Sequence, residues 1–138
     1  TDAKQIKTMW DMCRYELAWK LDKHSAWCSA FTKHHVEVLE YLEDIKYYYR
    51  QGYGSELNDN ISCELIQDMM KHMSTDAEPS VVAYFAHSAT VQLFLTSLGV
   101  AKDSDALRSD NYEQMRFRQW RTSKIGPFGA NLAAVKYK

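Results

Sequence analysis

The sequence of 138 residues lacks most of the signatures by which an enzyme is recognised from its residues alone. It contains no Gly-x-Ser-x-Gly, no phosphate-binding Gly-x-x-x-x-Gly-Lys loop and no His-Glu-x-x-His zinc motif. Its cysteines, Cys13, Cys28 and Cys63, include no Cys-x-x-Cys and have no histidine at ligand spacing, so they predict no metal site. We therefore expect neither a metal nor another cofactor, and no segment forms a complete active site by itself.

Charge of one sign and long apolar runs are also missing. With 17 basic and 18 acidic residues the net charge is −1, which favours neither nucleic acid nor an acidic membrane surface as a partner. The longest apolar run is far too short to cross a bilayer, so we expect no transmembrane segment. The first ten residues contain no initiator Met and no apolar core of a signal peptide, which is typical of the interior of a larger protein or of a processed product.

The most informative stretch that is present runs from Pro79 to Gly99. Residues 81–86 are uncharged and rich in β-branched and aromatic side chains, which predicts a strand buried on both faces. Ser88 can then cap a helix that Gly99 ends. Such a strand–helix turn lies at the edge of an α/β sheet where ligands bind, and a helix N-terminus favours anions. His87 would thus lie where a phosphate could bind, although a purely structural histidine is the commoner outcome of this pattern.

Three helices are expected before this stretch and one or two strands after it. Apolar residues at helical spacing predict helices over 3–22, 34–50 and 61–73, with a loop at 22–31. In the second helix the expected buried stripe is Val36, Leu39, Leu42, Ile45 and Tyr49, and in the third helix the methionines are expected to pack in the core. The remaining expectations are a helical turn at 103–107, an exposed strand or extended loop at 116–121, a turn at 125–130 and a strand at 131–137.

Two smaller features each have an ordinary explanation. The basic cluster of Arg116, Arg118, Arg121 and Lys124 could attract a polyanion, but a solvated edge is preferred. Asn60-Ile61-Ser62 is an N-glycosylation sequon, which has meaning only in a secreted protein.

Several separated blocks of the sequence resemble the multiple inositol polyphosphate phosphatases, a branch of the histidine acid phosphatases that includes phytases. The resemblance follows the family's order and covers nearly the whole chain. The blocks are Cys13 with Trp27-Cys28, the run VLEYLEDIKYYYRQGYG at 38–54, Ser62-Cys63 with 65–68, 84–87 with Thr90, Asn111-Tyr112, Phe117-Arg118, and 127–132.

The resemblance implies an α/β fold, present here in part: a helical portion at 1–77 followed at 78–138 by a strand–helix unit and strands of the phosphatase core. It also implies a mechanism without metal. A histidine in Arg-His-Gly attacks phosphorus, a second histidine helps to hold the phosphoryl oxygens, and a carboxylate after that second histidine protonates the leaving group. By resemblance His87 is the second histidine, and Thr90 and Arg118 are substrate-binding residues.

The sequence departs from this pattern in two ways. Arg-His-Gly is absent, because the nucleophile belongs to an N-terminal half that the chain is expected to lack, together with a final strand and a C-terminal tail. The family's His-Ala-Glu-Thr is replaced by His87-Ser88-Ala89-Thr90, so that Ala89 occupies the proton-donor position. Losing a general acid typically costs about a hundred- to ten-thousand-fold in rate. Ala89 is explained either by an engineered Glu→Ala change or by a naturally non-catalytic relative.

The function expected from the resemblance is hydrolysis of inositol polyphosphate monoesters by the complete protein, secreted or in the lumen of the endoplasmic reticulum. This chain alone is expected to be inactive. The resemblance also implies a Cys13–Cys28 disulfide, with Cys63 free or paired with the absent part, and Asn60 is the expected glycosylation site. The alternatives are a pseudophosphatase that binds polyanions without hydrolysing them, and an interaction module. The oligomeric state is left open.

Overall fold

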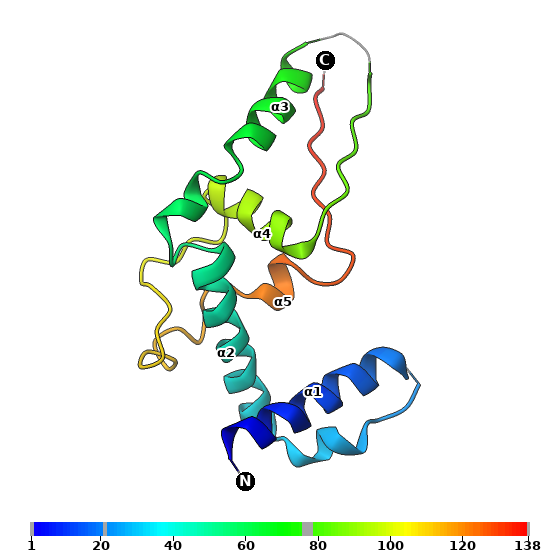
Figure 1. The fold of residues 1–138 in the computed structure, drawn as a ribbon, viewed down its shortest axis with the longest axis vertical. Helices are drawn as coiled ribbons and strands as arrows, with labels where there is room; N and C mark the ends of the chain where they lie inside the picture. Colours follow the sequence, from blue (N-terminus) through cyan, green and yellow to red (C-terminus); the bar gives the residue numbers. More distant parts are fainter. Residues whose placement is uncertain (1, 21, 76–78, 138) are drawn as a thin grey trace. The chain divides into compact units, whose positions relative to one another are not determined.

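The computed structural model in Figure 1 describes residues 2–20, 22–75 and 79–137. The chain divides into two compact units, residues 1–39 and 40–138, and each is described separately here. The domain boundary expected between residues 77 and 78 lies outside the described residues.

The first unit is a helix joined by a disulfide to a short 3-10 turn. The helix α1, Ala3–Trp19, begins with a capping box in which Asp2 accepts from the Gln5 N–H at 2.8 Å while Gln5 Oε1 accepts from the Asp2 N–H at 3.0 Å. The 3-10 helix η1, Ala26–Ala30, occupies part of the expected loop. Cys13 and Cys28, the pair that the resemblance implies, are bonded. Among the described residues of this unit only Cys13 and Ser25 are buried, so the disulfide replaces a substantial apolar core.

The core of the second unit forms against α2, Lys33–Gln51, a helix that crosses the division at residue 39. The expected aliphatic stripe is not the face that is buried: Leu42 is 51% exposed, whereas Tyr41, Asp44 and Tyr48 are buried. This face is buried because the irregular segment after residue 100 packs on it and forms hydrogen bonds with its polar atoms. The Tyr41 hydroxyl, for example, lies 2.9 Å from the Arg108 carbonyl and 2.8 Å from Asn111 Oδ1. The buried hydrophobic cluster consists of Tyr41, Tyr48, Leu107, Met115 and Trp120.

Four shorter elements complete the second unit. They are η2, Glu56–Asp59; α3, Cys63–Ser74; α4, Ser88–Ser97; and α5, Thr122–Ile125. None of the described residues of α3 is buried, and Met70 is 55% exposed, so the expected packing of its methionines in a core is wrong for Met70.

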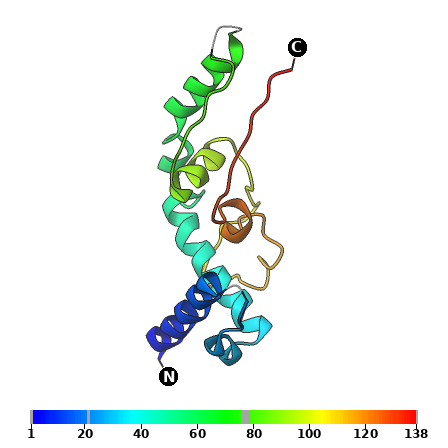
Figure 2. The ribbon, with the colours of Figure 1, turned by 90° about the vertical axis from the view of Figure 1, so that its right-hand side faces the viewer.

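The strands expected at 81–86 and 131–137 do not form, and residues 116–121, expected as an exposed strand or an extended loop, contain no strand either. The part of the chain that the structure describes is all-helical. Val81 and Phe85, expected to be buried on both faces, are 79% and 96% exposed. A strand exists only as a ladder with a hydrogen-bonded neighbour. The segments at 79–87 and 131–137 run near one another in Figure 1 but are separate in Figure 2, so neither serves as that neighbour. The α/β expectation is therefore incorrect for this chain by itself.

The irregular segment after Gly99 also differs from expectation. Residues 103–107 form no helical turn, while the turn expected within 125–130 is present, with the Ala130 N–H donating to the Pro127 carbonyl at 2.9 Å.

Candidate functional site

The N-terminus of α4 brings together three of the residues that the resemblance marks. His87 is the N-cap residue, in an extended conformation at φ −87° and ψ 161°, and no side chain caps the helix. Its carbonyl oxygen accepts the N–H groups of Thr90 and Val91 at 3.0 and 3.2 Å. His87 is exposed, whereas Ala89 and Thr90 are half-buried. The first N–H groups of a helix lack intrahelical partners and carry the positive end of its dipole, so an anion can approach next to the His87 imidazole.

The C-terminal half of α4 is anchored to the turn that follows α2. The Thr96 hydroxyl lies 2.8 Å from the Gln51 carbonyl and 2.9 Å from the Gln92 carbonyl. Ser97 donates to the Asn58 carbonyl at 3.3 Å, and Asn58 Nδ2 in turn donates to the Gly52 carbonyl at 2.8 Å. These bonds fix the helix at the end away from His87. Gln51 and Asn58, which lie on either side of the Gly52-Tyr53-Gly54 turn, therefore support α4.

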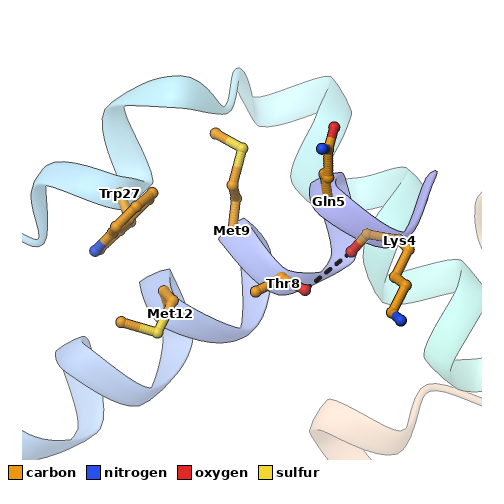
Figure 3. A pocket seen from close by; sticks show the side chains of 6 residues that line it. All are labelled: Lys4, Gln5, Thr8, Met9, Met12 and Trp27. Atoms are coloured by element: carbon orange, nitrogen blue, oxygen red, sulfur yellow. Dashed lines mark hydrogen bonds between the residues drawn. The ribbon is translucent and has the colours of Figure 1, made fainter. Parts of the chain in front are cut away.

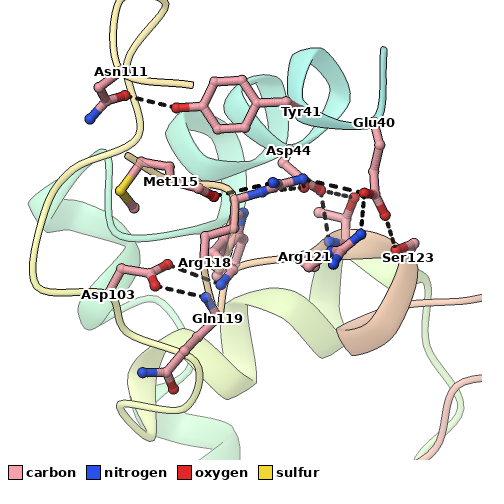
Figure 4. Close-up of polar contacts among 12 residues, drawn as sticks. Glu40, Tyr41, Asp44, Asp103, Asn111, Met115, Arg118, Gln119, Arg121 and Ser123 are labelled. Carbon is pink, nitrogen blue, oxygen red and sulfur yellow. Dashed lines mark hydrogen bonds and ion pairs between the residues drawn. The ribbon is translucent and has the colours of Figure 1, made fainter. Parts of the chain in front are cut away.

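A buried ion-pair network lies between α2 and the segment before α5 (Figure 4). Arg118, 6% exposed, donates from Nε to Asp44 Oδ2 at 2.8 Å, and its Nη2 pairs with the same carboxylate. Its Nη1 reaches the Met115 carbonyl at 3.3 Å, and its guanidinium carbon lies 4.8 Å from the centre of the Tyr41 ring. The guanidinium is therefore committed to groups inside the fold.

The other oxygen of Asp44 holds the start of α5. It accepts the Thr122 N–H at 2.8 Å and the Thr122 hydroxyl at 2.7 Å. Burial raises the pKa of the Asp44 carboxyl, while the bonds from Thr122 and Arg118 act in the opposite direction. Asp44 is fully buried, so its charge depends on these donors.

Glu40 completes the network one helical turn before Asp44. It pairs with Arg121 Nη2 at 2.5 Å and with Arg118 Nη2 at 3.5 Å, and it accepts the Ser123 hydroxyl. Although burial alone would raise it, the pKa of Glu40 is lowered by the hydrogen bonds from Ser123 and Arg121 and by the charges of both arginines.

The residues predicted as site residues thus fall into separate places. His87, Ala89 and Thr90 share one helix start, whereas Arg118 lies in the buried network, and no contact between Arg118 and His87 is present among the described residues. The expectation of a solvated edge is wrong for Arg118 and holds for Arg116 and Lys124, which are exposed.

Sequence reasoning missed the acidic half of the network. Neither Glu40 nor Asp44 belongs to the aliphatic stripe that the sequence predicts to be buried on this helix. A signal was available: Tyr41, Asp44 and Tyr48 follow the i, i+3, i+7 spacing of a buried helix face.

The first unit contains a shallow hollow of about 310 Å³ (Figure 3). Its lining is mostly apolar, with no carboxylate and no histidine, and consists of Lys4, Gln5, Thr8, Met9, Met12 and Trp27. Within the described ranges, no three His, Cys, Asp or Glu side chains come close enough to hold a metal ion. No helix in those ranges is long and apolar enough to cross a membrane.

Comparison with known proteins gives a consistent result over the whole chain. Residues 1–138 match the profile of the histidine phosphatase superfamily (branch 2). The chain is 51% identical over 132 residues to multiple inositol polyphosphate phosphatase 1 of Drosophila melanogaster, which covers 96% of this chain and 28% of that protein. It is 34% identical to the proteins of the same name in Gallus gallus and Homo sapiens, covering 99% of this chain and 32% and 30% of theirs. No solved structure matches. The chain therefore spans about 30% of the length of these relatives.

Proposed function

Because the chain belongs to branch 2 of the histidine phosphatase superfamily, we propose that it forms part of an enzyme that removes phosphate from inositol polyphosphates. Three similar proteins carry the name multiple inositol polyphosphate phosphatase 1. The single observation that carries the proposal is the placement of His87. In a chain with this family membership, His87 is the N-cap residue of α4, and no side chain caps the exposed N-terminus of that helix.

In the proposed mechanism this chain supplies part of the phosphate-binding site. The His87 imidazole and the first N–H groups of α4 donate hydrogen bonds to oxygens of the phosphoryl group, and the Thr90 hydroxyl lies on the same turn. The attacking histidine belongs to Arg-His-Gly, a sequence absent from these 138 residues, so the bond to phosphorus is made by another part of the protein. Arg118 stays in the substrate-binding set as a prediction only, because its guanidinium is engaged by Asp44.

The residue at position 89 decides whether the complete protein can hydrolyse its substrate. A methyl group cannot protonate the departing alkoxide, and the neighbouring Ser88 hydroxyl is far too weak an acid to do so at neutral pH. The same observation favours the second candidate function, a protein that binds inositol polyphosphates without hydrolysing them.

The test compares variants of the complete protein that contains this chain. In the enzyme, Ala89→Glu should raise kcat for phytate by about 10²- to 10⁴-fold with little change in KM. Ala89→Gln, which has nearly the same shape as glutamate but no ionisable proton, is the matched control and should not. His87→Ala should weaken phytate binding. Phytate binding without phosphate release from either the parent or Ala89→Glu would establish the second function. Absence of binding would overturn both.

We also propose where the protein acts and what completes its fold. The Cys13–Cys28 disulfide is typical of secreted proteins and of the lumen of the endoplasmic reticulum. Residues 78–138 would join an α/β core whose remaining strands come from the part of the relatives that this chain does not span, while residues 1–77 form the helical portion.

A further inference from the structure

We propose that Asn60 carries an N-linked glycan and that this glycan covers the thiol of Cys63. The first observation is that Asn60-Ile61-Ser62 is the only Asn-x-Ser/Thr sequence in the chain, since Asn58, Asn111 and Asn131 are not followed by Ser or Thr at the required position. The proposal rests on the secretory location proposed above and not on phosphate hydrolysis.

The structure places Asn60 where a sugar can be accommodated. Asn60 is exposed, at the end of η2, with φ −113° and ψ −12°. Its backbone is held in a turn by bonds to Leu57 and Cys63, and its side-chain Oδ1 faces the Cys63 sulfur. Ile61 beside it is 49% exposed. The residue that would bear the sugar thus lies on the surface.

The chemistry is a transfer from a lipid-pyrophosphate-linked oligosaccharide. A bond forms between Asn60 Nδ2 and the anomeric carbon of the first sugar, the bond from that carbon to the pyrophosphate oxygen breaks, and Nδ2 loses a proton. Ser62, the third residue of the sequon, is only 6% exposed in the folded chain. Transfer therefore precedes folding of this turn, as it does for a chain entering the secretory pathway.

Cys63 gives the glycan a role. It is the free cysteine of the chain and it is exposed, while its Sγ lies 4.0 Å from Asn60 Oδ1. A sugar on Nδ2 begins on the same amide group that the sulfur contacts, so the bulky glycan would stand directly over the thiol. In an oxidising compartment, where Cys13 and Cys28 are already bonded, an exposed thiol exchanges with other disulfides. Covering it would keep the chain from forming mixed disulfides.

The experiment uses the protein expressed through the secretory pathway of eukaryotic cells. Intact mass is measured before and after treatment with a peptide N-glycosidase. The parent and Ser62→Thr, which keeps the sequon, should carry a glycan, whereas Asn60→Gln and Ser62→Ala should not. A parent protein without a glycan would overturn the proposal.

The second measurement is the rate at which Cys63 reacts with a polymer-linked maleimide, with Cys63→Ser as the blank. Reaction should be several-fold faster after enzymatic removal of the glycan, and equally fast in Asn60→Gln. A thiol that reacts at the same rate with and without the glycan would overturn the covering role. A thiol that stays unreactive in the deglycosylated protein would do the same, because something other than the sugar would then protect it.

Discussion

Asp44 is a fully buried carboxylate whose charge is balanced mainly by Arg118. Removing one partner of a buried pair leaves the other charge uncompensated, which costs about 3–5 kcal/mol. We therefore expect Arg118→Met to lower the free energy of unfolding of the chain by this amount, measured by urea denaturation. Arg116→Met, on an exposed side chain two residues away, should change it by at most about 0.5 kcal/mol. Equal effects of the two substitutions would contradict the buried pair.

Glu40 makes the stability of the second unit depend on pH. Its pKa in the folded state lies below the ordinary value of 4.5, so the ionised form is favoured by folding. That contribution is present above the unfolded pKa and is lost as the pH falls through the folded one. Between about pH 5 and pH 3 the parent should lose more stability than Glu40→Gln. Glu113→Gln, at an exposed position, is the control, and its free energy of unfolding should change with pH as that of the parent does. If Glu40→Gln loses as much stability as the parent over this range, groups other than Glu40 are responsible.

The turn between α2 and η2 has no room for a side chain at Gly52. A Cβ on Gly52 would lie 2.6 Å from Cζ2 of the fully buried Trp120. Gly52→Ala should therefore destabilise the chain by about 1–3 kcal/mol, since overpacking displaces a core side chain. Gly126→Ala is the control, because its close contact is the side-chain end of Gln92, and it should cost less. Thermal unfolding would measure the loss of stability in both variants. An equal loss in Gly52→Ala and Gly126→Ala would contradict the close contact with Trp120.

The sequence predicts the helices of this chain better than their faces. The helices α1 to α4 are found within a few residues of their expected ends because each carries a local apolar period. The buried side of α2 could not be found in this way, because Tyr41 and Asp44 are chosen by partners 67 to 74 residues away. The expected strand at 81–86 was wrong for a similar reason: its apolar pattern is local, but a strand needs a neighbour.

The candidate site divides along the same line. His87, Ala89 and Thr90 lie within four consecutive positions, so their juxtaposition follows from a single helix start. Arg118 was assigned by resemblance alone, and only the tertiary structure shows that Asp44 and Glu40 surround it.

The molecule as a whole consists of two units with different sources of stability. The first has two buried residues among those described and one disulfide closing a loop of 15 residues, while the second has an aromatic core. A loop of this length contributes about 3 kcal/mol. Reduction, or replacement of both Cys13 and Cys28 by Ser, should therefore unfold residues 3–30 while leaving the second unit folded. Hydrogen exchange would show lost protection in α1 with unchanged protection near Trp120, and a simultaneous loss in both would contradict independent units.

The long separation between Asp44 and Arg118 also has a consequence in time. Synthesis proceeds from the N-terminus at about 5–20 residues per second, so the 74 residues that separate the two take roughly 4–15 s to be added. During that interval α2 exists on the ribosome without Arg108, Asn111 and Arg118, whose atoms bond Tyr41 and Asp44, and without the core residues Leu107, Met115 and Trp120, since all of these follow residue 100. For several seconds this face of the nascent helix is therefore exposed to association with other chains. A factor that shields the face would act before Trp120 is synthesised.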